Sequence, residues 1–360
     1  MPEGSFAALD YMFHPRSIAV VGASTQDGPG SFVAALKEMG FAGPLYPVNP
    51  KADEIQGLKC YPRLTEIPGD VDHVISSVPL RFVEQLVEDC AAKHVKVLHF
   101  FTAGFSETGD EEATALERRV LARAAELGIR VVGPNCMGLY VPASGLSFMP
   151  FLETEPGPVA LLSQSGANAG EFCRTGAARG LRYSKVVSYG NGADLRESEL
   201  LEYIAEDPET AVVGCYIEGI TDGPRFMRAL RKAAAAKPVV ILKGGRTEAG
   251  TRAANSHTGS LAGSLAIFDA AVRQAGAIRV DRMEELVDSV VAFRFLRSLR
   301  GPRAGIVGGG GGYSVLASDE VASFGLQMPA LSEETQRTLT EITPTAGTSV
   351  RNPVDTSVGW

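Results

Sequence analysis

The sequence predicts an α/β protein with parallel sheets, because strand-like and helix-like segments alternate along almost the whole chain. The strand-like segments are short, continuous apolar runs, as expected for parallel strands that are buried on both faces. Many of them end in turns rich in glycine, serine or asparagine, from which a helical pattern begins. Together these observations favour doubly wound domains.

The first domain is predicted over residues 1–150 and has the element order of a nucleotide-binding, Rossmann-like fold. Four apolar runs are typical of strands, and helical stretches lie between them. A further apolar run, 130–132, leads into Gly133-Pro134-Asn135. The expected strands are 17–21, 45–48, 74–78 and 95–101, and the expected helices are 30–39, 82–93 and 111–127.

A second domain is predicted over residues 156–300, after a linker at 153–158 that contains prolines and acidic residues. The renewed alternation of strands and helices indicates a flavodoxin-like domain. The expected strands are 159–162, 184–187, 212–217 and 238–242, and the expected helices are 167–179, 195–206, 224–236, 265–275 and 283–299.

The last part, residues 301–360, offers one clear strand at 303–307, one or two helices and a tail rich in proline, glycine and threonine. This is too little for a complete doubly wound domain. We therefore expect an incomplete unit: either the chain is truncated, or a partner completes it. The glycines at 308–312 allow close backbone approach, which is equally compatible with a ligand and with packing against a partner.

The composition is that of an ordinary globular protein, with 360 residues, 45% hydrophobic and 21% charged. A net charge of −8 argues against nucleic acid or an anionic membrane as the main partner, although helix N-termini still bind phosphate. Five scattered cysteines without a CxxC pair support neither a disulfide framework nor a zinc site, so we expect no metal site. With no signal peptide or membrane-spanning apolar run visible, we expect a cytoplasmic location.

His257 is the most informative single residue. It lies among small and hydroxylated residues, 253–263, shortly after a glycine-rich stretch at 244–250. No bulky neighbour fixes its imidazole in a core, so we expect a reachable ring that acts as a nucleophile or proton carrier. For such a histidine taken alone, simple solvation is the more common explanation.

Two further sites give His257 a role. Glu218 follows the strand at 212–217, where carboxylates of open α/β sheets often face the ligand crevice. Its carboxylate would accept one ring N–H and leave the other nitrogen nucleophilic, although a solvated loop glutamate is the alternative. The second site follows the strand at 159–162 and opens a helix, so it is either a phosphate cradle or a plain serine N-cap. It consists of Ser163, Gln164, Ser165 and Gly166.

The turn after the first strand favours a phosphorylated nucleotide over NAD. It is not a GxGxxG fingerprint, and the end of the second strand carries a lysine where an NAD site usually has an acidic residue. A lysine there suits a phosphorylated adenosine such as CoA, and a merely tight turn is the alternative. The residues concerned are Gly22, Ala23, Ser24 and Thr25, with Asn49, Pro50 and Lys51.

Other loops of the first sheet are expected to line the same edge, because the carboxyl ends of parallel strands meet there. Val78-Pro79, Glu107 and Asn135 lie on such loops. Cys136 follows directly, but no histidine lies near it in the sequence. We therefore expect a small packed residue rather than a nucleophile.

Taken in order, these motifs resemble the NDP-forming acyl-CoA synthetases, the superfamily of succinyl-CoA synthetase and ADP-forming acetate–CoA ligase. The match is to the α-type part, a CoA-binding Rossmann-like domain followed by a flavodoxin-like CoA-ligase domain, and it covers nearly the whole chain. The stretches that carry it are 14–24, 133–136, 163–166, 243–246, 256–259 and 352–355.

The resemblance implies that His257 becomes phosphorylated, that Glu218 supports it, and that the 163–166 loop stabilises the phosphohistidine. It also implies that CoA is a substrate held by 22–25, 49–51, Val78-Pro79 and the loop near Glu107. The reaction would convert acyl-CoA, phosphate and NDP into a carboxylic acid, CoA and NTP.

One departure from the family concerns the nucleotide. No stretch of this sequence is typical of an ATP-grasp domain, so the resemblance implies that ADP or ATP with Mg²⁺ binds to a β subunit or fused domain, in a hetero- or homo-oligomer. A CoA-binding regulatory module without ligase turnover is the main alternative. An NAD(P)-dependent oxidoreductase is weaker, because the fingerprint is absent and Asn49-Pro50-Lys51 lacks the acidic residue.

Overall fold

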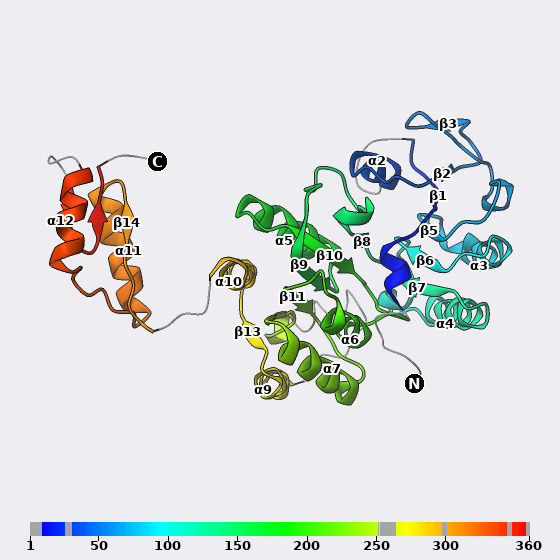
Figure 1. The fold of residues 1–360 in the computed structure, drawn as a ribbon. Helices are drawn as coiled ribbons and strands as arrows, with labels where there is room; N and C mark the ends of the chain where they lie inside the picture. The colour runs from blue at the N-terminus through cyan, green and yellow to red at the C-terminus, as the bar shows by residue number, and fades with distance from the viewer. Residues whose placement is uncertain are drawn as a thin grey trace. The chain divides into compact units, whose positions relative to one another are not determined.

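The computed structural model describes residues 9–25, 31–250, 252, 264–296, 301–343 and 348–357. The chain divides into two compact units, Met1–Phe295 and Leu296–Trp360. The large unit contains a five-stranded sheet, a six-stranded sheet and a small two-stranded one (Figure 1). Since all the strands of the two larger sheets are parallel except β8, the predicted α/β class with parallel sheets is confirmed.

The first sheet is fully parallel and has the strand order β2-β1-β5-β6-β7. The chain runs from β1 outward to β2 and then returns to β5 on the other side of β1. The loops after β1 and β5 therefore diverge at a switch point of the sheet, where ligands of such folds bind. The strands are β1 (Ile18–Val21), β2 (Leu45–Val48), β5 (His73–Ser76), β6 (Val97–Phe100) and β7 (Arg130–Val132).

Helices cover both faces of this sheet because successive strand residues point to opposite sides. Val20 and Ile75 pack with α2 (Phe32–Glu38) in one apolar cluster. Ala19 and Val74 pack with α3 and α4 in another. These helices are α3 (Val83–Ala92) and α4 (Glu111–Glu126), and the shorter elements are the β3 (Glu54–Ile55) and β4 (Leu58–Lys59) hairpin and the 3-10 helices η1 (Asp10–Phe13), η2 (Leu64–Glu66), η3 (Leu80–Phe82) and η4 (Ser106–Thr108).

The second sheet has the order β13-β12-β11-β9-β10-β8 and a second switch point, between β9 and β11. Its edge strand β8 (Gly138–Tyr140) comes from the stretch predicted as the first domain and pairs antiparallel with β10. The other strands are β9 (Pro156–Ser163), β10 (Tyr183–Ser188), β11 (Val212–Ile217), β12 (Val239–Lys243) and β13 (Ile278–Val280); the helices are η5 (Pro142–Ser144), α5 (Gly166–Ala178), α6 (Glu197–Glu206), α7 (Gly223–Ala236), α9 (Leu265–Ala275) and α10 (Met283–Phe295).

The two sheets share one hydrophobic core. The apolar cluster on the α2 side of the first sheet continues into the second sheet, where it includes Leu161, Val213 and Ile241. An ion-pair network adds to this contact: Arg130 on β7 binds Asp194 and Glu199, which precede and begin α6. The segment between β10 and α6 is thus fixed to β7, the edge strand of the first sheet.

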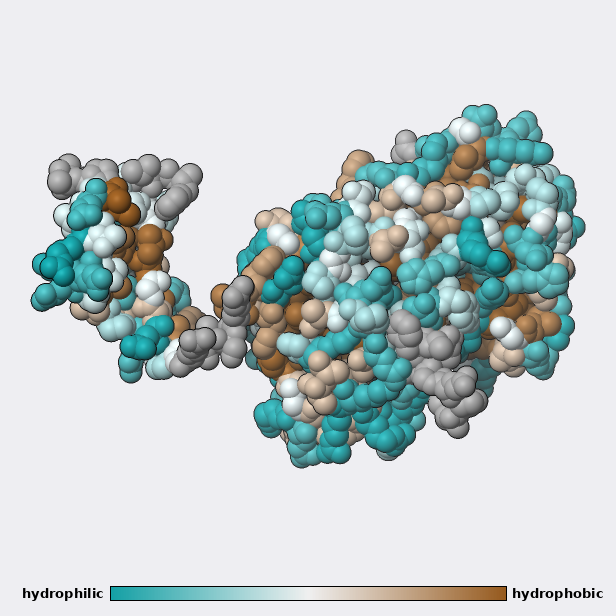
Figure 2. Space-filling model, viewed as in Figure 1, coloured by the Kyte–Doolittle hydropathy of each residue, from teal (hydrophilic) through white to brown (hydrophobic). Residues whose placement is uncertain are grey.

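The small unit has a three-stranded sheet with the order β14-β16-β15. Its first strand, β14 (Val307–Gly308), is shorter than the predicted strand 303–307, because β16 pairs with it at only two positions. Several large apolar side chains are exposed on this unit, including Val315, Leu316 and Phe324. Hydrophobic residues are visible on the face of this unit that Figure 2 shows. The remaining elements are α11 (Gly311–Ser323), α12 (Glu333–Ile342), β15 (Ser349–Val350) and β16 (Val354–Asp355).

Among the described residues, no helix is both long enough and apolar enough to cross a membrane.

Candidate active site

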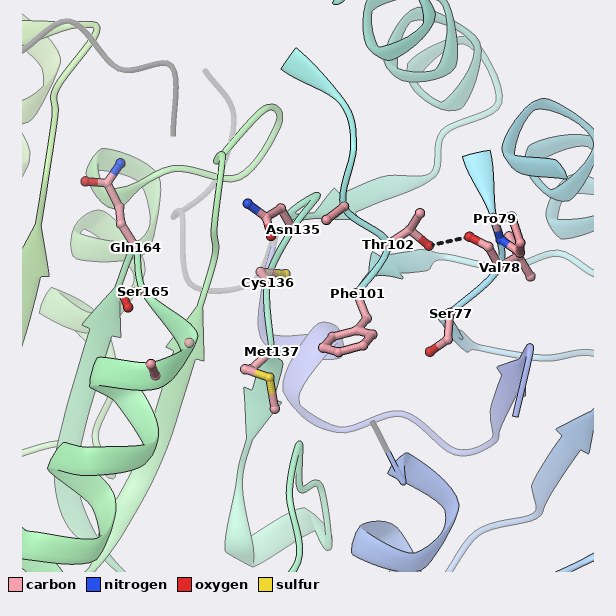
Figure 3. Close-up of a pocket in the computed structure, with 13 residues that line it drawn as sticks. Ser77, Val78, Pro79, Phe101, Thr102, Asn135, Cys136, Met137, Gln164 and Ser165 are labelled. Atoms are coloured by element: carbon pink, nitrogen blue, oxygen red, sulfur yellow. Dashed lines mark hydrogen bonds between the residues drawn. The ribbon is translucent and has the colours of Figure 1, made fainter. Parts of the chain in front are cut away.

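A cavity of about 530 Å³ lies where the carboxyl ends of the two sheets meet. The loops after β5, β6 and β7 form one wall, and the start of α5 forms the other (Figure 3). Six predicted site residues, one of them the first residue of α5, therefore lie around one space, although they come from both domains. These are Val78, Pro79, Asn135, Gln164, Ser165 and Gly166.

Helix α5 begins at this cavity with a conventional N-cap. The Ser165 hydroxyl accepts a hydrogen bond from the Asn168 N–H at 3.3 Å. The remaining N–H groups of the first turn and the positive end of the helix dipole suit an anion. The two interpretations of Ser165 are therefore compatible: it caps the helix, and it lines the cavity.

Ser163, unlike Gln164, Ser165 and Gly166, does not face the cavity. It is buried, and its hydroxyl donates to the Ser165 carbonyl at 2.7 Å and accepts from the Ser165 N–H at 3.2 Å. These two bonds give the loop its shape. Ser163 does not belong to the lining of the cavity, so its hydroxyl supports the cradle from behind.

Gln164 connects the loops after β9 and β11. Its amide oxygen accepts hydrogen bonds from the Gly219 N–H, at 2.9 Å, and from the Glu218 N–H. With the oxygen engaged in this way, the amide nitrogen is the end of the side chain that is suited to donate to an anion. Gln164 lines the cavity, as expected for a phosphate-binding residue.

Glu218 is buried at the end of β11, and no donor among the described residues reaches its Oε2 atom. The Tyr216 hydroxyl bonds to this carboxylate, and burial together with the Glu218 charge raises the tyrosine pKa. A Cβ at Gly244 would lie 3.0 Å from Glu218 Cγ, so the glycine permits this tight packing. Because an unpaired buried carboxylate oxygen is costly, Oε2 is a strong candidate acceptor for a further donor.

Lys243, at the end of β12, lies beside this carboxylate. Its ammonium donates to the Glu218 carbonyl at 2.6 Å, and burial lowers its pKa. His257, the residue predicted to receive the phosphate, lies outside the described residues, as do its neighbours 253–263. Its predicted role and its predicted contact with Glu218 remain predictions.

The predicted CoA-binding turns lie side by side at the switch point of the first sheet. Gly22 has a left-handed φ of 81°, and a Cβ there would lie 3.0 Å from the Ser77 carbonyl. The Asn49 amide donates to the Ala23 carbonyl at 2.9 Å and accepts from the Lys51 N–H at 2.9 Å. Four of the residues predicted to bind CoA lie in these two turns and are exposed to solvent: Ser24, Thr25, Pro50 and Lys51.

Glu107 and Asn135 are connected through Asn191, which follows β10 of the second sheet. The Asn191 amide donates to Glu107 at 2.7 Å, and the Asn135 amide donates to Asn191 Oδ1 at 3.4 Å. Glu107 also accepts from the Gly104 N–H at 2.5 Å. Its carboxylate therefore holds the cavity wall in place. Asn191 is not among the residues predicted from the sequence, although it lies in a Tyr189-Gly190-Asn191-Gly192 turn after a strand.

Cys136 lines the cavity but does not have the properties of a nucleophile. It is buried, its thiol contacts the Phe100 carbonyl at 3.7 Å, and burial raises its pKa. The thiolate is therefore not available at neutral pH. This placement agrees with the expectation of a small packed residue.

Two domain families match the sequence in the expected order. A CoA binding domain matches residues 16–142, and the succinyl-CoA ligase like flavodoxin domain matches residues 156–293. The first match covers all strands of the first sheet and also β8 of the second sheet, and the second match covers β9 to β13 and helix α5. The cavity therefore lies between the CoA-binding and ligase domains.

Relatives and solved structures agree with this assignment. The chain is 40% identical over 350 residues to the alpha subunit of an ADP-forming acetate–CoA ligase (II) of Pyrococcus furiosus, covering 96% of this chain and 76% of that subunit. It is 38% identical to an ADP-forming acetate–CoA ligase of Methanocaldococcus jannaschii, of which it spans only 49%.

A solved structure of acetyl-coenzyme A synthetase 1 from Ca. Korarchaeum cryptofilum, in complex with phosphate and ADP, superposes with a TM-score of 0.80 at 37% identity. The superposition covers 97% of this chain and 75% of the chain of the solved structure. The chain thus belongs to the NDP-forming acyl-CoA synthetase family and corresponds to its α-type portion, a CoA-binding domain followed by a flavodoxin-like ligase domain.

Proposed function

We propose that this chain carries the acyl-CoA half of an acid–CoA ligase (NDP-forming), with phosphorylated His257 as the intermediate. The observation that supports this most directly is the single cavity between the CoA-binding edge and the start of α5. A thioester carbonyl and a phosphate held at these two walls would meet within one space. Such positioning is the main requirement of acyl and phosphoryl transfer.

In the first step, a phosphate oxygen attacks the thioester carbonyl of acyl-CoA. The new C–O bond replaces the C–S bond, and the CoA thiolate leaves and takes up the proton that the phosphate loses. The N-terminus of α5, Ser165 and the Gln164 amide stabilise the phosphate charge. The products are an acyl phosphate and CoA.

In the second step, a ring nitrogen of His257 attacks the phosphorus of the acyl phosphate. The P–O bond to the acyl group breaks and the carboxylate leaves, so the acid is released and the histidine carries the phosphate. Glu218 accepts the other ring N–H and keeps the attacking nitrogen unprotonated. Its Oε2, which has no hydrogen-bond partner among the described residues, supports this role.

In the third step, the phosphate passes from His257 to NDP and forms NTP. We infer that the nucleotide and Mg²⁺ bind to an ATP-grasp β subunit or fused domain. The alpha-subunit name of the P. furiosus relative and the greater length of the M. jannaschii relative support a further component. The five cysteines, all free and buried, suit the reducing cytoplasm, where we place the reaction.

Labelling with radioactive phosphate tests the proposal. The chain is incubated with acetyl-CoA and labelled phosphate, and the label on the protein is measured after acid and after base treatment. We expect an acid-labile, base-stable label on the wild type and none on His257→Ala. Absence of label on a wild-type chain that binds CoA measurably would contradict the ligase and favour a CoA-binding module without turnover.

A further inference from the structure

The side chain of Met137 lies on the cavity wall between the start of α5 and the ring of Phe101 (Figure 3). It packs directly on Gly166, the first residue of α5, because an added Cβ there would lie 2.4 Å from Met137 Cγ. The Met137 N–H donates to the Ser188 hydroxyl at 3.2 Å, which fixes its backbone to the end of β10. The backbone is therefore held, while the side chain projects along the wall.

The described lining of the cavity is uncharged. Its thirteen residues include no aspartate, glutamate, lysine, arginine or histidine, and its apolar members include Val78, Phe101 and Met137. In the proposed reaction the phosphate occupies the donors at the start of α5. A second carboxylate on the acyl group would therefore lose its hydration without gaining a charged partner among these residues. The lining therefore suits an acyl chain that is apolar beyond its carbonyl.

We propose that Met137 is a specificity-determining residue that limits the length of the acyl group, so that the site favours thioesters of short, uncharged acids. This inference rests on the proposed function, because it places the acyl group in this cavity. The thioester carbonyl lies between the CoA edge at Val78 and the helix start at Gly166. The rest of the acyl chain must then pass Met137 or stop before it.

Methionine suits this role because it is unbranched and fills irregular space, so its truncation opens volume without disturbing a rigid neighbour. One methylene in an apolar pocket changes selectivity by about 10- to 200-fold. A shorter side chain at position 137 would therefore relax the length limit strongly. A Cβ at position 166 would do the opposite, since it would displace Met137 from its present place.

The experiment measures dissociation constants for acetyl-CoA and hexanoyl-CoA by calorimetry, without phosphate, so that no turnover occurs. The variants are Met137→Ala, Gly166→Ala and the double variant, each checked for folding by its melting temperature. Met149→Ala is the matched control. Met149 packs on Gly170, one turn further along α5, at 3.3 Å from an added Cβ, and it does not line the cavity.

We expect Met137→Ala to shift the preference towards hexanoyl-CoA by roughly tenfold or more. Gly166→Ala should shift it towards acetyl-CoA, the double variant should recover the longer acyl chain, and Met149→Ala should match the wild type. An unchanged preference in Met137→Ala, or an equal change in Met149→Ala, overturns the inference. If Met137→Ala does not fold, Gly166→Ala provides the test: a shift of its preference towards acetyl-CoA supports the inference, and an unchanged preference overturns it.

The two proposals fail in different ways. If Met137→Ala leaves the length preference unchanged while His257 of the wild type is labelled, only the role of Met137 is rejected. The opposite result is that the wild type carries no label but Met137→Ala still shifts the length preference. This result rejects the ligase and leaves an acyl-CoA-binding site in which Met137 limits the length of the acyl group.

Discussion

The side chain of Gln164 holds the backbone of Glu218. Its amide oxygen accepts from the N–H groups of Glu218 and Gly219, so the loop after β9 fixes the loop after β11. These two strands are neighbours in the sheet and flank its switch point. The candidate phosphate cradle and the carboxylate expected to orient His257 are thereby fixed relative to each other.

Gln164→Ala is expected to lower both stability and phosphorylation. It leaves two buried N–H groups without an acceptor, at a cost of about 1–3 kcal/mol for each. The free energy of unfolding from urea titration should fall accordingly, and the label on His257 should decrease. Gln85→Ala is the control, because Gln85 makes a single exposed bond to Asp89 and should change neither quantity. Wild-type values for Gln164→Ala would refute the connection.

Glu218→Gln is expected to reduce phosphorylation without loss of stability. The amide is the same size as the carboxylate but cannot support a positively charged imidazole, so the label should fall by about 10- to 100-fold. Because the substitution removes a buried charge whose Oε2 has no described partner, the melting temperature should not fall. CoA binding should be unchanged by calorimetry. Undiminished labelling would exclude Glu218 as the orienting group.

Arg130 is expected to be needed for the alignment of the two sheets. Its guanidinium binds both Asp194 and Glu199 at 3.0 to 3.1 Å, and Asp194 also accepts from the Val131 N–H at 2.7 Å. Since this network is partly buried and the substitution leaves two carboxylates without their cation, Arg130→Ala should cost about 2–4 kcal/mol and weaken labelling.

Arg123→Ala provides the matched control for Arg130→Ala. Arg123 also binds two carboxylates, those of Glu88 and Glu126, but on the exposed surface of α4. The Arg123→Ala substitution should lower the free energy of unfolding much less than Arg130→Ala, because ion pairs on the surface are screened by water. Equal losses of unfolding free energy in the two variants would contradict the proposed role of Arg130.

The sequence predicted the elements that are long and strongly patterned. The run 212–217 and the helix 265–275 have the predicted bounds, because a buried parallel strand and an amphipathic helix each carry a clear local pattern. It did not predict β8 or β13, each of three residues, or the hairpin of β3 and β4. Such short strands exist only through their partners, which local composition does not reveal.

For the candidate site, too, the sequence predicted residues with a clear local signal and not those that depend on distant contacts. Gln164 and Val78 were found because they follow strands, and strand ends of an open sheet meet at one edge. Met137 lies on the same loop as Asn135, which was expected at the ligand edge, but it was not singled out, and Asn191 was not predicted. Their importance comes from contacts across the two sheets: Met137 packs on Gly166, and Asn191 contacts Glu107. Ser163 was expected to bind phosphate, but its hydroxyl is engaged within its own loop.

The pair of buried histidines in the first sheet should make the large unit sensitive to acid. His73 has no hydrogen-bond partner for either ring nitrogen among the described residues, and its ring centroid lies 6.5 Å from that of His99. Burial lowers the pKa of His73 to about 3 and that of His99 to about 4. Both rings are therefore neutral in the folded protein at neutral pH.

The sign of the effect follows from linkage. Below pH 6.5 the unfolded chain binds protons at these histidines and the folded chain does not, so the free energy of unfolding falls as the pH falls. The effect continues until the folded pKa values, near 4 and 3, are reached. Between pH 7.5 and 5 each histidine should remove about 2 kcal/mol of stability.

His73→Leu tests this prediction, because an apolar side chain suits a site in which the ring makes no described hydrogen bond. Urea titrations at pH 7.5 and pH 5 should show a smaller loss of stability for His73→Leu than for the wild type, by about 2 kcal/mol. His94→Asn is the control, since His94 is exposed and has a left-handed φ of 53° that asparagine tolerates. Parallel pH profiles for His73→Leu and the wild type would show that the acid sensitivity of the large unit has another origin.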